Sequence, residues 1–110
     1  GILSPADCLS VGIIFTLKKK GYTPSNIPVI TGQDATAEAL QNVKEGYQAM
    51  TIYKSRDDLH DAVIDMVRSI SSGKNANIND TTTYNNGVKD MDSFLCTPEL
   101  IDRSNLAKLL

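Results

Sequence analysis

The order of apolar and polar positions predicts short strands that alternate with helices. Three short apolar runs, at residues 2–3, 28–31 and 49–53, have the length and composition of buried strands. Between and after these runs, apolar residues recur at helical spacing. Strands and helices that alternate in this way are typical of an α/β fold with a largely parallel sheet.

The first predicted helix runs from Pro5 to about Lys20. Ser4 is expected as its N-cap, because Pro at the first helical position and an acidic residue three positions after the cap are helix-start signals. Apolar residues occupy most of the circumference of this helix, so we expect it to be well buried. Gly12 is expected to allow close packing on the sheet.

Two more helices are predicted between residues 34 and 74. One begins after Asp34 and ends at Gly46, and its expected buried face is formed by Ala37, Leu40 and Val43. The other begins at Ser55, with Asp58 as its capping partner. It carries a one-sided apolar stripe of Leu59, Ala62, Val63, Met66, Val67 and Ile70.

The last third of the chain is predicted to be less regular. Residues 75–86 are rich in Asn, Asp and Thr and should form a loop, followed by an extended segment at 94–97 and a short helix at 101–110. Three strands are few for a parallel sheet, which needs cover on both faces. We therefore expect a truncated part of a lobe, completed by association with another copy or by a part of the chain that is missing.

The segment from Thr31 to Lys54 is the strongest candidate for a binding site. It is a βαβ unit with Asp34 after its first strand and Lys54 after its second. Ligands of open parallel sheets bind outside the carboxyl ends of the strands, and a carboxylate beside an ammonium suits a polyol. Two simpler interpretations remain open: Asp34 as a cap of the following helix, and Lys54 as a solvated charge.

Two neighbouring residues are weaker candidates. Gln33 could orient Asp34 or reach the ligand itself. Asp7 also follows a strand, although a capping role in the first helix explains it equally well.

Composition and residue types argue against several other functions. Net charge of −2 and a pI near 5.2 disfavour a nucleic-acid partner. His60 is the only histidine, and Cys8 and Cys96 lack metal-site spacing, so we expect neither a metal site nor a catalytic triad. We expect both cysteines to be buried free thiols, and a disulfide between them is the alternative that the sequence leaves open. No phosphate-binding glycine loop is present. The sequence therefore predicts a protein that is not an enzyme and needs no cofactor.

Four segments, SPADCLSVG, PVITGQDA, MTIYK and NDTTTYNNGVKDMDSFLCTPELI, resemble the carboxyl-terminal part of bacterial sugar-binding proteins of ABC transporters. The similarity is to the xylose-binding and multiple-sugar-binding branch of the type I periplasmic binding proteins, and it covers essentially the whole chain. It implies a Rossmann-like lobe that closes with a second lobe on a monosaccharide.

The resemblance also implies a division of the chain and a set of sugar contacts. Residues 1–54 would belong to the carboxyl-terminal lobe, residues 55–93 would pack on the missing amino-terminal lobe, and residues 94–110 would cross back. Asp34 and Lys54 match family positions that hydrogen-bond sugar hydroxyls. Ala6 replaces an asparagine that binds sugar in some relatives, which removes one contact, whereas Asp7 keeps the acidic residue that follows it.

The implied partners are a pentose or hexose and the membrane permease of a transporter. The protein would be exported, either periplasmic or lipid-anchored at the cell surface. One alternative is a sugar-sensing domain coupled to a membrane kinase or to a transcriptional repressor. A phosphoacceptor role for Asp34 is a further alternative, but only Asp7 supplies another acid for the Mg²⁺ that such sites require.

Overall fold

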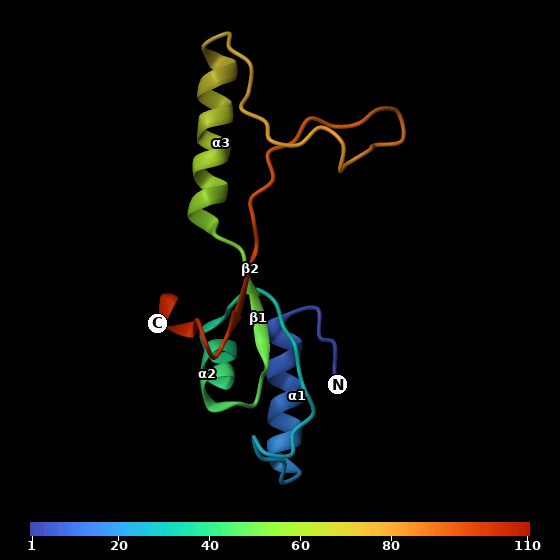
Figure 1. Cartoon of the computed structure of the whole chain (residues 1–110), viewed down its shortest axis with the longest axis vertical. Helices are drawn as coiled ribbons and strands as arrows, with labels where there is room; N and C mark the ends of the chain where they lie inside the picture. Colours follow the sequence, from blue (N-terminus) through green and yellow to red (C-terminus); the bar gives the residue numbers. More distant parts are fainter. The chain divides into compact units, whose positions relative to one another are not determined.

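The computed structural model describes all 110 residues and divides them into two compact units. Unit 1 comprises residues 1–54 and 98–110, and unit 2 comprises residues 55–97. Unit 1 contains helices α1 (Asp7–Lys19) and α2 (Ala37–Glu45), strands β1 (Met50–Tyr53) and β2 (Glu99–Asp102), and the 3₁₀ helix η1 (Leu106–Lys108). Unit 2 contains helix α3 (Arg56–Ser71) and a long loop (Figure 1). None of these helices combines the length and the apolar character needed to cross a membrane.

The sheet of unit 1 joins parallel segments to one antiparallel strand. Ile2 and Ile30 form a parallel bridge, and the carbonyl of Ile30 accepts a hydrogen bond from Ala49 N, 2.9 Å away. Strand β1 then pairs with β2 in antiparallel register, with Tyr53 opposite Glu99. The predicted α/β architecture is therefore confirmed, with an additional antiparallel strand beside its parallel part.

The prediction of a helix over residues 101–110 is wrong. Residues 99–102 form β2, and only Leu106–Lys108 are helical. The reason is tertiary, because Ile101 is fully buried in a cluster with Leu40, Val43 and Leu106. Pairing with β1 holds Ile101 in this cluster, and this pairing outweighs the local preference for helix.

Helix α1 differs from its prediction at its start and in its burial. It begins at Asp7, the cap residue Ala6 makes no side-chain capping bond, and the Ser4 hydroxyl instead donates to the carbonyl of Ala6. Phe15 is 57% exposed, and no atom would lie within 4 Å of a Cβ placed at Gly12. The expected close packing at Gly12 is therefore wrong, and the structure covers only one side of α1.

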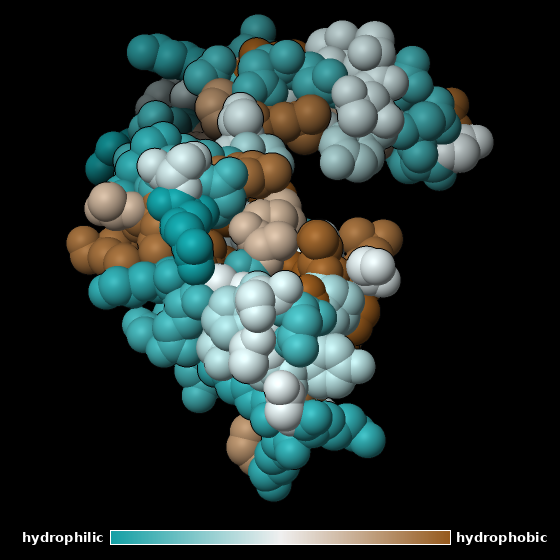
Figure 2. Space-filling model, turned by 60° about the horizontal axis from the view of Figure 1, so that its bottom comes forward, coloured by the Kyte–Doolittle hydropathy of each residue, from teal (hydrophilic) through white to brown (hydrophobic).

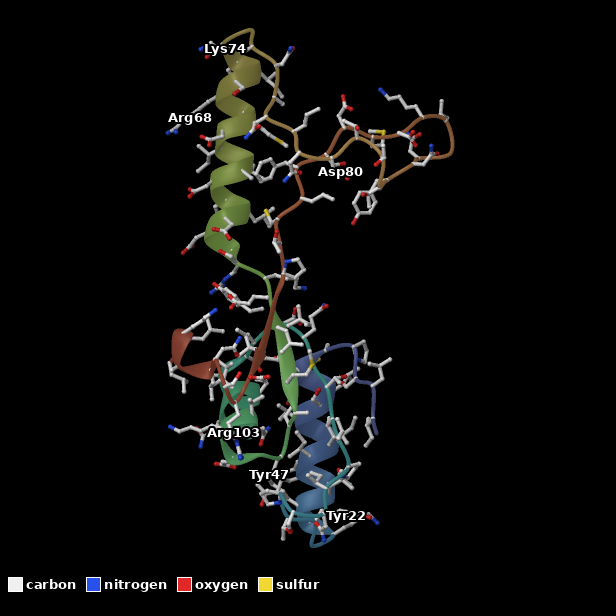
Figure 3. All side chains as sticks on the ribbon, viewed as in Figure 1. Tyr22, Tyr47, Arg68, Lys74, Asp80 and Arg103 are labelled. Carbon is white, nitrogen blue, oxygen red and sulfur yellow. The ribbon has the colours of Figure 1, made fainter.

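Helix α2 follows its prediction closely. The hydroxyl of Thr36 accepts from Ala39 N at its start, and Gly46 ends it in the left-handed conformation with φ of 87°. Leu40 and Val43 are buried as predicted, although the third buried apolar residue is Ala39 rather than Ala37. A side chain at position 46 would also collide with the guanidinium of Arg103, which Figure 3 shows beside this end of α2.

Unit 2 has a largely exposed helix and a hairpin-like loop. Ser55 caps α3, since its hydroxyl accepts from Asp58 N at 3.1 Å, but no residue of α3 is buried. The loop forms two antiparallel bridges, one between Asp80 and Ser93 and one between Asn85 and Asp90. Figure 3 labels Asp80 in this loop. Figure 2 shows hydrophobic surface in several places. The large apolar residues of α3 that are exposed are Leu59, Val63, Ile64, Val67 and Ile70.

Candidate functional site

Asp34 and Lys54 form an ion pair at the carboxyl end of the parallel part of the sheet. Lys54 Nζ lies 2.9 Å from Oδ1 of Asp34. Both side chains are about half exposed, at 53% for Lys54 and 48% for Asp34. The structure therefore brings together the two residues that the sequence analysis singled out, and leaves both accessible to a ligand.

The backbone at Asp34 is held in an uncommon conformation. Asp34 and Ala35 have φ values of 104° and 50°, which non-glycine residues seldom adopt. The amide of Asp34 donates to the carbonyl of Ile52 at 2.8 Å, so the turn is fastened to β1. Thr36 supplies the cap of α2. Asp34 is therefore not the cap of that helix, and strain of this kind often accompanies a functional side chain.

Asp7 has a different place from the one expected. Its side chain is fully buried, and its carboxylate accepts from Thr36 N at 2.9 Å, from Thr51 Oγ1 at 2.9 Å and from Gln48 Nε2 at 3.0 Å. The structure thus turns Asp7 into the interior rather than toward a ligand, which corrects its selection as a candidate sugar contact.

Gln33 lies beside Asp34 and is only partly exposed. Its backbone carbonyl accepts from Asp7 N at 2.8 Å, so the residue joins the turn to the first turn of α1. Gly32, one residue earlier, faces the same buried groups, because a side chain there would collide with the Asp7 carboxylate and the Gln48 amide.

Gln48 and Thr51 were missed by the sequence analysis. Both are buried, at 2% and 0% exposure, and both contact Asp7. One signal could have indicated them, since they are the polar residues in and next to the apolar run at 49–53. A polar side chain in a buried strand needs a hydrogen-bonding partner.

Unit 2 has a separate hollow of about 420 Å³. It lies between α3 and residues 77–79 and 94–97, and three carboxylates of α3 line it: Asp58, Asp61 and Asp65. No group of three or more His, Cys, Asp or Glu side chains has the geometry to hold a metal ion. The hollow contains none of the four candidate residues.

The two cysteines are free, as expected. Cys8, however, is exposed, and Cys96 is partly exposed, so the expectation that both thiols are buried is wrong. The exposure of Cys8 follows from the uncovered side of α1. His60 is also exposed on α3.

Comparison with known proteins gives consistent matches along the chain. The family described as "Periplasmic binding protein domain" matches residues 1–75. The multiple sugar-binding periplasmic receptor ChvE of Rhizobium radiobacter is 40% identical over 99% of this chain and 31% of its own length. The D-xylose-binding periplasmic protein of Escherichia coli is 30% identical over 96% of this chain and 31% of its own length.

Solved structures that resemble this chain are of the same class as these relatives. An ABC transporter solute binding protein from Clostridium phytofermentans with bound β-D-glucose is 33% identical, with a TM-score of 0.82 over 94% of this chain and 32% of that one. A carbohydrate transporter solute binding protein from Chloroflexus aurantiacus, in complex with D-glucose, has a TM-score of 0.84 at 26% identity over 98% of this chain and 31% of that one. The chain spans about a third of the length of these proteins. It belongs to the periplasmic binding protein domain family and has the α/β fold of that family.

Proposed function

We propose that this chain is the carboxyl-terminal part of a monosaccharide-binding protein of an ABC transporter, in which Asp34 and Lys54 bind sugar hydroxyls. The observation that carries the proposal is the half-exposed ion pair between these two residues at the strand ends. Several relatives and solved structures that the chain matches are sugar-binding proteins.

The chemistry of the pair fits a polyol. Oδ1 of Asp34 contacts Lys54, and Oδ2 can accept a hydrogen bond from a sugar hydroxyl. The ammonium of Lys54 has three N–H donors, so it can keep Asp34 and still donate to a hydroxyl oxygen. Hydrogen bonds that involve a charged group are stronger than neutral ones. Gln33 is the third proposed contact, because it is partly exposed beside Asp34.

The site in this chain is one wall of a cleft. Asp34 and Lys54 lie on an open surface of unit 1, and the sequence has no Trp and two Phe to stack on the apolar face of a sugar. We propose that the other wall belongs to an amino-terminal lobe, on which residues 55–93 pack, and that closure is a hinge motion near Lys54 and Phe94. Binding by the isolated chain should be weak.

The relatives suggest either a pentose or a hexose as the sugar. The solved structures hold D-glucose, and two relatives are named for D-xylose. The proposed protein is exported, periplasmic or lipid-anchored, and delivers its sugar to a membrane permease. It carries out no reaction on the sugar.

A sensing role is a second candidate, favoured by the name of one relative, a sugar-binding periplasmic receptor. The sugar site would be the same in both roles. A membrane kinase that co-purifies with the sugar-loaded protein would support sensing, whereas stimulation of a permease ATPase would support transport.

The proposal is tested by calorimetry with D-glucose and D-xylose on the full-length protein that contains this sequence. Asp34→Ala and Lys54→Ala are each expected to weaken binding by tenfold or more, as loss of a hydrogen bond to a charged group costs about 1.5–3 kcal/mol. Lys44→Ala removes an exposed lysine from α2 and is the matched control. Equal affinity of Asp34→Ala and wild type would refute the proposed site.

A further inference from the structure

The strained turn beside the ion pair has a separate acceptor for each of three consecutive backbone amides. Asp34 N donates to the carbonyl of Ile52 at 2.8 Å. Ala35 N donates to Oγ1 of Thr51 at 3.2 Å, and Thr36 N donates to Oδ2 of Asp7 at 2.9 Å. Two of these three acceptors are thus side-chain atoms.

The two side-chain acceptors are themselves linked and buried. The Thr51 hydroxyl lies 2.9 Å from both carboxylate oxygens of Asp7 and donates to them. A hydroxyl has one proton, so its donation to Asp7 leaves its lone pairs for the amide of Ala35. Asp7 and Thr51 are both 0% exposed, and water does not compete for these contacts.

The buried side-chain amide of Gln48 also holds the Asp7 carboxylate in place. Nε2 of Gln48 donates to Oδ1 of Asp7 at 3.0 Å and to the carbonyl of Met50 at 3.1 Å. The reverse amide orientation would place Oε1 of Gln48 against two acceptors, so only one orientation is favourable. The backbone of Asp7 is also fixed, because its amide donates to the carbonyl of Gln33.

From these contacts we infer that Asp7 and Thr51 are positioning residues of the sugar site. They hold the left-handed turn at Asp34 and Ala35 so that the Asp34 carboxylate meets Lys54 before any sugar arrives. Thr51 lies in β1, three residues before Lys54, so a single strand positions both charged groups. The inference rests on the proposed function, and it adds that the wall is preorganised, which lowers the entropy cost of binding.

A pair of substitutions at position 51 separates the hydroxyl from the shape of the side chain. Thr51→Val keeps the branched shape and removes the hydroxyl, whereas Thr51→Ser keeps the hydroxyl and removes the methyl group. In the full-length protein we expect Thr51→Val to bind D-glucose or D-xylose about tenfold more weakly, and Thr51→Ser to bind within about twofold of wild type. Hydrogen exchange at the amides of Ala35 and Thr36 should accelerate in Thr51→Val alone.

Ser10→Ala is the control for a general loss of stability. Ser10 is fully buried nearby and its hydroxyl donates to the carbonyl of Thr31 at 2.7 Å, and none of its side-chain hydrogen bonds reaches the turn at 34–36. This variant should lose stability and keep its affinity for sugar. Should Thr51→Val fail to fold, Asp7→Asn is the second variant, with the same expected loss of affinity.

The outcomes distinguish this inference from the proposed function. If Asp34→Ala binds sugar as tightly as wild type, the proposed function itself is overturned. If Asp34→Ala loses affinity while Thr51→Val, or Asp7→Asn in its place, keeps it, only the positioning role is overturned. A Thr51→Ser variant as weak as Thr51→Val would also overturn it, because packing of the methyl group would then be the cause.

Discussion

Lys54 Nζ lies 2.9 Å from Asp34 Oδ1, yet about half of each side chain is open to solvent. Exposed ion pairs contribute little to stability, because water and salt screen them and two long side chains must be ordered. The pair is therefore better suited to meeting a ligand than to holding the fold together.

This exposure predicts that stability and binding respond differently to substitution. Asp34→Ala should change the free energy of unfolding of this chain by less than about 1 kcal/mol, measured by urea denaturation. Ile101→Ala, at a fully buried position, should cost about 2–5 kcal/mol in the same assay. A loss of unfolding free energy in Asp34→Ala as large as that in Ile101→Ala would show that the ion pair stabilises the fold.

Substitution by alanine at Gly12 and at Gly32 should change the stability of the chain in opposite directions. Gly32→Ala would drive a methyl group into the Asp7 carboxylate and the Gln48 amide, so it should destabilise the chain by about 1–3 kcal/mol. Gly12→Ala meets no atom within 4 Å in an exposed part of α1 and should stabilise it by up to about 1 kcal/mol. Thermal unfolding followed by circular dichroism measures both, and equal effects would contradict the buried environment of Gly32.

The exposed apolar stripe of α3 predicts self-association of this chain. Val63, Val67 and Ile70 are each more than half exposed, and contiguous apolar surface of this kind promotes association. Sedimentation velocity should show species larger than a monomer, and Val67→Lys should shift them toward monomer. Lys74→Ala is the control, since Lys74 lies beyond the end of α3. A wild-type chain that is monomeric at all concentrations would contradict the prediction.

The stability of the loop in unit 2 should depend on pH at its base, where Asp80 and Thr83 contact each other. The Thr83 hydroxyl and amide donate to the Asp80 carboxylate, and these hydrogen bonds hold the pKa of Asp80 below its ordinary value. A lowered pKa means that the contribution to stability is fully present above the ordinary pKa near 3.9, and is lost as the pH falls through the lower pKa of the folded state.

Nuclear magnetic resonance can follow this titration. The amide signals of Thr82 and Thr83 should move only below the ordinary Asp pKa, toward their positions in Asp80→Asn at neutral pH. Amide shifts centred above that pKa would mean that the carboxylate is not stabilised by Thr83.

The elements with complete local signals were predictable from the sequence. Helices α2 and α3 have side-chain caps at Thr36 and Ser55, and the glycine at position 46 ends α2, so their positions follow from neighbouring residues. Strand β2 was missed because its conformation depends on pairing with β1, nearly fifty positions earlier in the chain. Local sequence contains no information on that partner.

The two charged residues of the candidate site were predictable from the sequence, but the buried contacts beneath them were not. Asp34 and Lys54 follow from the rule that strand ends carry functional groups. The role of Asp7 was misjudged because its position after a strand suggested exposure, whereas its burial results from Thr51 and Gln48. Those contacts join residues more than forty positions apart, and no spacing rule reaches that far.

The pairing of Tyr53 with Glu99 places the exit and the return of the polypeptide on neighbouring strands of unit 1. In terms of connectivity, unit 2 is an insertion in a β-hairpin. A tight two-residue turn in place of residues 54–98 would close that hairpin and join the two parts of unit 1 into one short chain. Such a miniature would still contain Asp7, Asp34 and Thr51, and it would let the turn at Asp34 be studied without the rest of the protein.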